Sequence, residues 1–221
     1  MPAYEQTTDA GATTGRPDVA AAIREAIARG DFAPNQRLVE ADLSEQFGAS
    51  RSGVRAALLE LTNEGLVERI QHRGARVRAV TLDEAIEISE VRMAVEGLCA
   101  GKAAECVAGD EIAELRDIGA AMRAAVTDGH VLKYSELNKA LHQRIMEISG
   151  QRTAAAVLGR LRAQNVRHRF QLALVPGRPG VSLSEHLAII DGICAHDPEA
   201  AERAARAHLA SVIEALKSAR A

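Results

Sequence analysis

The stretch ASRSGVRAALLELTNEGLVER, residues 49–69, decides the fold because it holds a complete helix signal followed by the beginning of a strand. Three apolar residues recur at helical spacing and form one face: Val54, Leu58 and Leu61. Arg51 and Arg55 are spaced i, i+4, so they share a different face of the same helix. Gly65 ends the pattern. The stretch therefore predicts an amphipathic helix that begins with two exposed arginines.

Short elements flank this helix on both sides. Upstream, apolar spacing predicts a helix from Val19 to Gly30 and a short helix in VEADLSEQFG, with a turn and a short strand in DFAPNQRL between them. Downstream, LVERI and ARVRAV alternate and are separated by QHRG, which predicts a two-stranded hairpin. Three helices and a hairpin are the plan of a winged helix-turn-helix domain, which we place at residues 16–80. Residues 1–15 are rich in Thr, Ala and Gly and predict a disordered tail.

Beyond Val80 the sequence predicts helices alone. Thr81 and Glu84 form a capping-box pattern at the start of the first one. The expected helices span residues 82–107, 109–127, 130–149, 151–173, 182–195 and 198–219. The expected fold class is therefore mainly α, with a winged helix-turn-helix domain followed by an all-α antiparallel helical bundle over residues 81–221.

Composition limits the class of protein. Hydrophobic residues make up 47% and aromatic residues 2% of the chain, which favours closely packed helices with aliphatic cores. The net charge of −3 means that any contact with nucleic acid depends on a local basic patch. Cys99, Cys106 and Cys194 are widely spaced, so we expect reduced, buried thiols. No signal peptide or membrane-spanning run is recognisable, so we expect a cytoplasmic protein without membrane contact.

Such a basic patch surrounds the central helix. From residue 51 to 78 there are six arginines against three glutamates. Arginine in the first turn of a recognition helix can donate two parallel hydrogen bonds to guanine in the major groove. The candidate DNA contacts lie at the helix start and the hairpin tip: Ser50, Arg51, Ser52, Arg55, His72, Arg73 and Gly74. The alternative is that these arginines only solvate a surface helix and pair with Glu60 or Glu64.

Residues 37–77, RLVEADLSEQFGASRSGVRAALLELTNEGLVERIQHRGARV, resemble the DNA-binding domain of the GntR family of bacterial transcription regulators. The family pattern is close to L-x-E-x-x-L-A-x-x-x-G-V-S-R-x-P-V-R-E-A-L-x-x-L-x-x-E-G-L-V, with R-G-x-x-V in the wing. The resemblance implies that Arg51 and Arg55 recognise DNA and that the hairpin tip contacts it. Gly53 stands where proline is usual and Ala56 where glutamate is usual, and these departures bear on base preference.

The second half of the chain carries side chains that can bind a metal ion. Asn138 and His142 are spaced i, i+4 and share a helical face, and His186 and His208 lie on two later helices beside apolar residues. Three imidazoles and an amide oxygen around one point suit a divalent ion such as Zn²⁺ or Ni²⁺, with positions left for water or an anion. A histidine on an apolar helix face is more often a hydrogen-bonded core residue, so spacing alone leaves both interpretations open.

Residues 85–213 resemble the FCD-type effector domain of FadR-like GntR regulators. The segments that carry the resemblance are EVRMAVEGLCA, LNKALHQRIMEISG and SEHLAIIDGICAHDPEAAERAARAHL. In that domain one Asp or Asn and three His positions bind a metal, which implies four ligands here: Asn138, His142, His186 and His208. Many relatives have aspartate in place of Asn138, and a neutral amide is a weaker ligand for a hard cation than a carboxylate.

The same resemblance implies that Arg92 helps to hold an acidic effector, whose carboxylate takes the open metal positions. Arg92 and Glu96 share a helical face, and the alternative is a surface salt bridge worth about 0.2–0.5 kcal/mol. Further candidates for the effector pocket are Arg144, Arg162, Asn165 and Arg169. The remaining histidines are expected in loops or at the surface: His130, His168 and His196.

These features favour a ligand-responsive transcription regulator, most simply a repressor, that binds a pseudo-palindromic operator as a homodimer. A small organic acid bound through the metal would shift the population between dimer geometries. One alternative is a metal-dependent enzyme in which Glu96 or Glu185 assists a metal-bound water. It lacks a convincing general-base motif and leaves the DNA-binding half unexplained, so we expect no enzyme. The other alternative is a DNA-binding protein with a ligand-free structural bundle.

Overall fold

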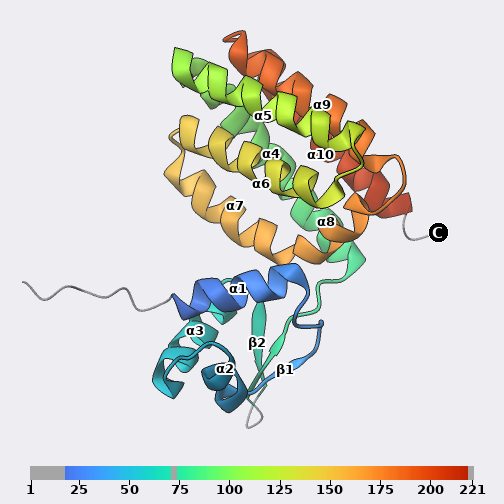
Figure 1. Ribbon diagram of the computed structural model, residues 1–221. Coiled ribbons are helices and arrows are strands. Elements are labelled where there is room, and N and C mark those ends of the chain that lie inside the picture. Colours follow the sequence, from blue (N-terminus) through green and yellow to red (C-terminus); the bar gives the residue numbers. More distant parts are fainter. Residues whose placement is uncertain (1–17, 71–73, 219–221) are drawn as a thin grey trace, which may run out of the picture.

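The computed structural model describes residues 18–70 and 74–218, so the expected tail, residues 1–15, lies outside the described residues. Figure 1 shows a small N-terminal unit beside a larger helical one. We call the smaller one, residues 18–80, the winged unit, and the larger one, residues 81–218, the helical bundle. No helix in the described part of the chain is long and apolar enough to cross a membrane.

The winged unit combines helices with a small antiparallel sheet. Its described elements are α1 (Val19–Arg29), β1 (Arg37–Leu38), α2 (Glu40–Gln46), α3 (Arg51–Asn63), β2 (Val67–Ile70) and β3 (Gly74–Val77). The strand order is β1-β3-β2. The predicted hairpin of β2 and β3 is confirmed, and β1 joins it as a third strand, with Leu38 paired to Ala75.

Apolar side chains of the helices and strands meet in one core of the winged unit. The residues predicted for the inner face of α3 are all buried: Val54, Leu58 and Leu61. They belong to one cluster with Ile23 of α1 and Leu38 of β1. Because this face of α3 is buried, the face that carries Arg51 and Arg55 is left to solvent.

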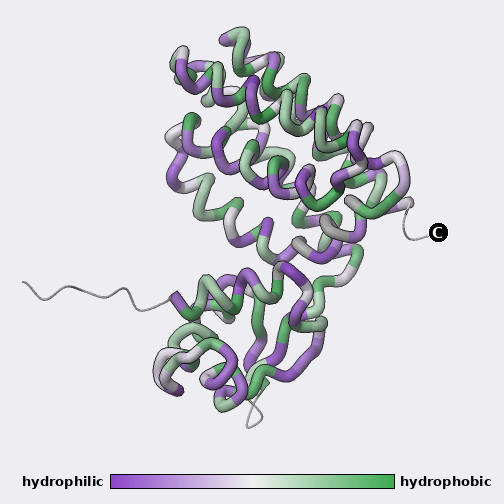
Figure 2. Tube along the Cα trace, viewed as in Figure 1, coloured by the Kyte–Doolittle hydropathy of each residue, from purple (hydrophilic) through white to green (hydrophobic). Residues whose placement is uncertain are grey.

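The helical bundle is arranged around α4, which packs most extensively against α10 (Figure 1). Its described elements are α4 (Leu82–Cys106), α5 (Gly109–Thr127), α6 (Val131–Ile148), α7 (Arg152–Gln164), α8 (Val166–Ala173), α9 (Arg178–Cys194) and α10 (Pro198–Ser218). Figure 2 shows hydrophilic and hydrophobic residues alternating along these helices, as amphipathic helices in a bundle require. The mainly α fold class is thus confirmed.

The first turn of α4 follows the predicted cap in part. Thr81 Oγ1 accepts a hydrogen bond from the Glu84 backbone N–H at 3.2 Å, which fixes the start of the helix. The Glu84 carboxylate pairs with Arg78 of the preceding segment. The start of α4 is therefore tied to the chain that enters it from the winged unit.

The expected helix over residues 151–173 is divided at Asn165 into α7 and α8. Asn165 is fully buried, and its side-chain amide donates a hydrogen bond to Ser89 of α4, which holds the break in place. His130 and His196 lie at helix ends, as expected, whereas His168 is half-buried within α8. The expectation for His168 was therefore wrong, because its Nε2 lies 3.0 Å from the Val80 oxygen, in the segment that enters α4.

Helix α9 begins at Arg178, four residues before the expected start at residue 182. Gly177 adopts a left-handed φ of 81° and reverses the chain just before the helix. Pro179 then fits in the first turn, where a missing N–H costs nothing. The segment PGRPG is thus half loop and half helix, although its composition resembles a loop throughout.

The three cysteines are free thiols within the described residues. Cys99 is buried and Cys194 is half-buried, but Cys106 is exposed. This corrects the expectation that all three are buried. Cys106 is the last residue of α4, beyond the part of the helix that the other helices cover.

Candidate functional site

The start of α3 lies on the surface of the winged unit. Ser50 Oγ caps the helix by accepting a hydrogen bond from the Gly53 N–H at 3.1 Å, and Ser52 Oγ lies 3.1 Å from Ser50 Oγ. The side chains of Arg51 and Arg55 are exposed on the first turns. Both arginines and both serines thus occupy one exposed helix end.

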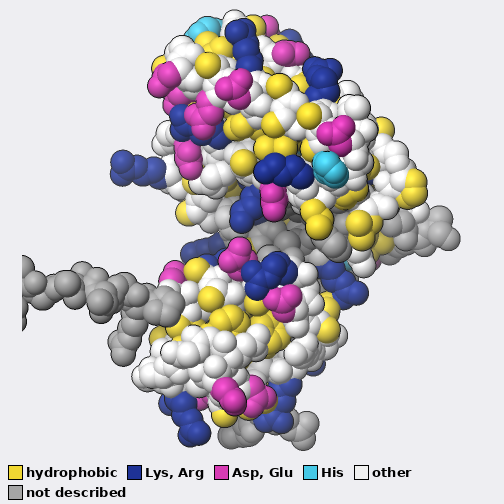
Figure 3. All heavy atoms as spheres, in the orientation of Figure 1, with side chains coloured by type: hydrophobic (Ala, Val, Ile, Leu, Met, Phe, Trp, Pro, Cys, Tyr) yellow, Lys and Arg dark blue, Asp and Glu magenta, His cyan; other side chains and the backbone are white. Residues whose placement is uncertain are grey.

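Arg55 is held by a carboxylate of α2. Its Nη2 and Nε donate to the two carboxylate oxygens of Glu40 at 2.8 and 3.2 Å. Figure 3 shows basic and acidic side chains next to one another at the end of the winged unit that is remote from the bundle. Solvent screens an exposed pair of this kind and leaves it weak, so a phosphate or a base can displace the carboxylate.

Among the residues that the structure describes, the alternative pairing of these arginines with Glu60 or Glu64 is not found. Glu60 and Glu64 both pair with Arg24 of α1, at 3.0 and 2.6 Å. At the hairpin tip, Gly74 begins β3 with a φ of 90°, whereas His72 and Arg73 lie outside the described residues.

A buried cluster of three histidines occupies the helical bundle. His142 of α6, His186 of α9 and His208 of α10 each offer a ring nitrogen, and these atoms all lie within 4.8 Å of one another. The Nε2 atoms of His142 and His186 are 3.2 Å apart. Each of the three residues is at most 6% exposed. Burial of His186 and His208 agrees with their predicted place beside apolar residues of two late helices.

Each histidine ring is oriented by a polar side chain that contacts its Nδ1 atom. His142 Nδ1 lies 3.2 Å from Glu96. His208 Nδ1 lies 2.7 Å from Glu185, and His186 Nδ1 lies 3.1 Å from the Tyr134 hydroxyl. Carboxylates accept hydrogen bonds only, so the Nδ1 atoms of His142 and His208 donate and their Nε2 lone pairs are free for a metal.

The electrostatics of the cluster favour uncharged rings at His142 and His186. Burial lowers the pKa of His142 to about 3, an effect that Arg162 strengthens and Glu96 opposes. Burial also lowers the pKa of His186 well below its ordinary value, and His208 and His142 add to this. Neutral imidazole is the form that coordinates a metal, so these rings are ready to bind one near neutral pH.

Asn138 supplies a fourth polar atom, one turn before His142 on α6. Its Oδ1 is buried and has no hydrogen-bond partner among the residues that the structure describes. It lines the same cavity as His142 and His208. An orphaned carbonyl oxygen beside three imidazoles fits a divalent ion. Because all four of these ligands would be neutral, the ion would keep its full charge and attract an anion.

The cavity has a volume of about 60 Å³, room for several water molecules. Its lining combines the candidate ligands with cations and apolar residues: Arg92, Tyr134, Asn138, His142, Leu172, Arg178, Pro179, Ser182, His208 and Val212. Arg92 is 3% exposed, and its Nε donates to Glu96 at 2.9 Å. Its Nη1 is buried without a partner in the described ranges. The ion pair of Arg92 with Glu96 is therefore buried and not on the surface, and the unpaired Nη1 of Arg92 can donate to a carboxylate.

Glu96 holds several groups of the site together. Its carboxylate contacts Arg92, His142 and Arg162, the last at 3.0 Å. Burial opposes its ionisation, yet Arg162 and Arg92 hold the pKa of its carboxyl well below the usual range. The pKa of Glu185 is also lowered: burial opposes the shift, and its hydrogen bonds with His208 and Ser211 outweigh it. Neither carboxylate has the raised pKa that a general base near neutrality needs.

Two further candidates lie away from the cavity. Arg144 follows His142 by two residues and therefore faces the other side of α6. It pairs there with Glu111 and Glu114 at 3.1 and 2.7 Å. Asn165 lies in the break between α7 and α8. The side chain of Arg169 lies outside the described residues.

The sequence analysis missed several residues of this site. Tyr134 lies four residues before Asn138 on α6, so helical spacing from the ligands could have found it. Arg178 donates to Ser211 at 2.7 Å and Glu185 at 3.3 Å, and Ser182 contacts Tyr134. Arg178 belongs to the early part of α9, where the sequence indicated a loop, and Ser182 is the first residue of the helix that the sequence predicted, so no periodicity pointed to either of them.

Comparison with known proteins agrees with both halves of the fold. Residues 16–77 match the family model "Bacterial regulatory proteins, gntR family", and residues 87–211 match the model "FCD domain". The chain is 27% identical over 189 residues to the HTH-type transcriptional repressor RspR of Escherichia coli K12, covering 86% of this chain and 83% of that protein. It is 30% identical over 214 residues to an uncharacterised HTH-type transcriptional regulator in an unstable DNA locus of Streptomyces ambofaciens, covering 94% and 87%.

Among solved structures, Escherichia coli McbR/YncC has the same fold. The TM-score is 0.80 at 20% identity, with 92% of this chain and 97% of that chain covered. The matched family and relatives are transcriptional regulators rather than enzymes, as the sequence predicts. The chain therefore belongs to the GntR family of bacterial transcriptional regulators, with an FCD domain following its DNA-binding helices.

Proposed function

We propose that this protein is a repressor whose DNA binding responds to a small carboxylic acid held at a metal ion in the helical bundle. The observation that carries the proposal is a cluster of three oriented histidines, two of which, His142 and His208, line one cavity together with the residues of two orphaned buried atoms, Asn138 Oδ1 and Arg92 Nη1. An unfilled oxygen ligand calls for a cation, and an unfilled guanidinium donor calls for an anion.

The metal ligands in this proposal are Asn138, His142, His186 and His208. Imidazole nitrogen suits Zn²⁺ and Ni²⁺, so these are the ions that we expect. The bound ion would supply a positive charge for one end of the acid. Arg92, and behind it Glu96, would orient the other polar groups. The small volume and the apolar Leu172 and Val212 favour a compact acid.

The winged unit would bind DNA through the start of α3. Arg51 and Arg55 would contact bases, and Arg55 would exchange Glu40 for DNA. Ser50, Ser52 and the hairpin tip with His72, Arg73 and Gly74 would contact the backbone. We assign DNA binding to residues 16–80, and effector binding and dimerisation to residues 81–221. Repression is supported by the relative RspR, which is named a repressor.

Two copies of the chain would read the two halves of a pseudo-palindromic operator. Val91 and Leu98 are 50% and 45% exposed on one face of α4, and an apolar stripe of this kind supports a homodimer through the bundle.

Calorimetry of the purified protein tests the sensing step. Protein loaded with Zn²⁺ or Ni²⁺ is titrated with a panel of small carboxylates, and protein treated with a chelator is titrated in parallel. We expect one metal ion per chain and acid binding in the loaded protein alone. If the loaded and the chelator-treated protein give the same titrations and neither binds an acid, the alternative of a structural bundle without a ligand is favoured.

A further inference from the structure

Four consecutive residues at the end of α7, Arg162 to Asn165, lie where the winged unit meets the bundle. Figure 1 shows α7 and α8 on the side of the bundle that faces the winged unit. Among the described residues, no helix or strand of one unit makes extensive contact with an element of the other. Few contacts therefore hold the two units, and a single hydrogen bond between them has a large influence on their orientation.

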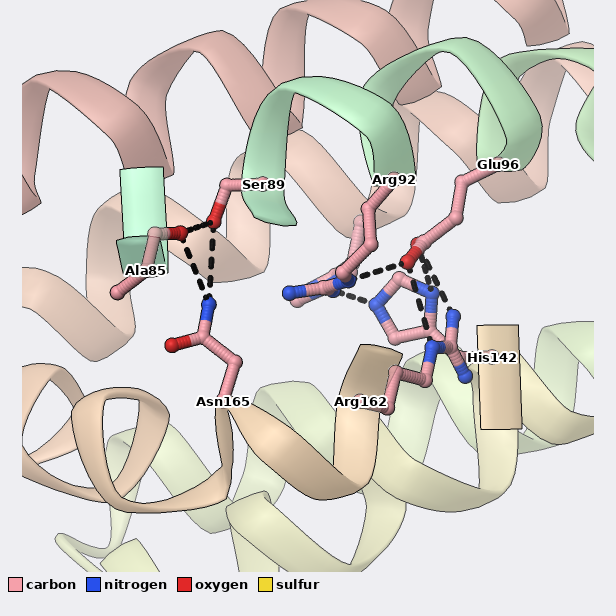
Figure 4. Close-up of polar contacts among 8 residues, drawn as sticks. Ala85, Ser89, Arg92, Glu96, His142, Arg162 and Asn165 are labelled. Carbon is pink, nitrogen blue, oxygen red and sulfur yellow. Dashed lines mark hydrogen bonds and ion pairs between the residues drawn. The ribbon is translucent and has the colours of Figure 1, made fainter. Parts of the chain in front are cut away.

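Arg162 connects this segment to the cavity. Its Nη2 lies 3.0 Å from Glu96 Oε2, and its side chain is 13% exposed. The same carboxylate accepts from His142 and from Arg92, the cation with the free donor (Figure 4). Any change in the charge that Arg92 or His142 presents to Glu96 therefore changes how strongly Glu96 holds Arg162.

Gln164 connects the segment to the recognition helix. Its side-chain Nε2 donates a hydrogen bond to the backbone oxygen of Glu64, the residue that caps the end of α3, at 2.7 Å. Gly65 makes this approach possible, because a Cβ there would lie 2.4 Å from Gln164 Nε2. Ala163 packs against the apolar core of the winged unit. The end of α7 thus contacts the end of α3 through the Gln164 hydrogen bond and the core of the winged unit through Ala163.

Asn165 fixes the segment to α4. Its Nδ2 donates to the Ala85 oxygen and to Ser89 Oγ, both at 3.2 Å, in a fully buried position (Figure 4). His168, one turn further, donates through Nε2 to the Val80 oxygen at 3.0 Å. These bonds make Asn165 a fixed point directly after the two movable contacts of Arg162 and Gln164.

We propose that Arg162–Asn165 couples the cavity to DNA recognition, with Arg162 responding to the charge at Glu96 and Gln164 setting the position of α3. This coupling rests on the proposed sensing function for its biological use. Helix α3 extends about 20 Å from Glu64 to Arg51 at ~1.5 Å per residue, so a small tilt at its end displaces the DNA-reading arginines. A homodimer on two half-sites is sensitive to such a displacement.

A double-mutant cycle read by hydrogen exchange tests the coupling without metal or DNA. Glu96→Gln removes the charge that Arg162 meets, and Gln164→Ala removes the bond to α3. We expect Glu96→Gln to speed exchange of the Glu64, Gly65 and Leu66 amides about fivefold, the factor for one hydrogen bond, while α1 amides stay unchanged. In the Gln164→Ala background these amides already exchange fast, so we expect that Glu96→Gln does not accelerate their exchange further.

Arg160→Ala, an exposed arginine of the same helix, is the matched control and leaves these amides unchanged. If the Glu96→Gln variant does not fold, Arg162→Gln takes its place in the cycle. In Arg162→Gln the Glu96 carboxylate still has Arg92 as its partner. Equal acceleration in both backgrounds, or none in either, overturns the coupling. Because neither metal nor operator enters the experiment, failure of the sensing function is detected separately, by the calorimetry described above.

Discussion

The start of α3 and the histidine cluster of the bundle are two proposed binding regions with opposite physical character. Arg51 and Arg55 are exposed charges on one helix, and one of them pairs with a surface carboxylate. His142, His186 and His208 are buried rings from three helices, each held by a further polar group. Exposed charges can adapt to a long polyanion, whereas a buried, pre-oriented cluster can select one small ion and its ligand. The difference predicts how each region responds to substitution.

The largest effect is expected in the buried cluster. His186→Ala removes one ligand and leaves the other two without a complete site, so metal affinity falls by more than about 100-fold. Calorimetric titration with Zn²⁺ measures this loss. His130→Ala, a substitution of an exposed histidine at the start of α6, is the control and keeps full affinity. Unchanged metal binding in His186→Ala would remove the cluster from the account.

The exposed region responds in DNA affinity alone. Arg51→Ala is expected to weaken specific operator binding by ~1–3 kcal/mol, about 5- to 150-fold, because a bidentate base contact is lost. Fluorescence anisotropy at fixed salt measures the change, and metal affinity should stay the same. Arg203→Ala, which removes an exposed arginine of α10, is the charge-matched control. A wild-type affinity in Arg51→Ala would contradict the assigned role of α3.

A smaller effect is expected one layer outside the metal ligands. Glu185→Gln weakens the bond that orients His208 and should lower metal affinity about 10-fold to 100-fold, with the fold intact. Glu199→Gln, at a fully solvated position on α10, is the matched control. If both variants bind metal equally well, Glu185 only fills space beside His208.

Asn138→Asp is expected to raise the metal affinity, whereas His186→Ala and Glu185→Gln lower it. A carboxylate in place of the amide oxygen should raise the affinity for a divalent ion about tenfold, and it should weaken acid binding because less positive charge remains. Calorimetry with Zn²⁺ and then with the acid separates these two effects. Lower metal affinity in this variant would place Asn138 Oδ1 outside the coordination sphere.

The smallest effect concerns the pair that holds Arg55. Glu40→Gln frees Arg55 and removes a negative charge near DNA, so operator affinity should rise by about 1.5- to 5-fold, the range of an exposed ion pair. The gain should shrink at high salt, where such pairs are screened. Weaker operator binding in Glu40→Gln would mean that Glu40 orients Arg55 for recognition and does not compete for it.

The sequence predicted the winged unit well because its signals are local. The apolar spacing of α3, its Ser50 cap and the alternation of β2 and β3 each lie within one short segment. The strand β1 has only two residues, too few to show the alternating pattern of a strand. It is a strand because it pairs with β3, and no local pattern of the sequence identifies this partner. Local signals thus describe elements, and pairing needs the fold.

The bundle site was only partly predictable, since it joins α4, α6, α9 and α10. Spacing placed the histidines on helix faces beside apolar residues and favoured a core role over a metal role, and the family resemblance selected the ligands. Tyr134 lies one helical turn before Asn138 and was within reach of the spacing, whereas Arg178 reaches the site through packing between helices, which no pattern along the chain encodes. The break at Asn165 carries neither Gly nor Pro, and it exists because a buried amide finds partners on α4.

The central claim is that occupancy of the buried cluster controls DNA binding by the exposed helix. Fluorescence anisotropy with the upstream intergenic DNA, at one salt concentration, tests it by comparing metal-loaded wild type with His186→Ala across a panel of carboxylates. The account predicts that one acid weakens operator binding by wild type and leaves His186→Ala unaffected. An acid that shifts both proteins equally, or specific DNA binding that no acid changes in either, would contradict it.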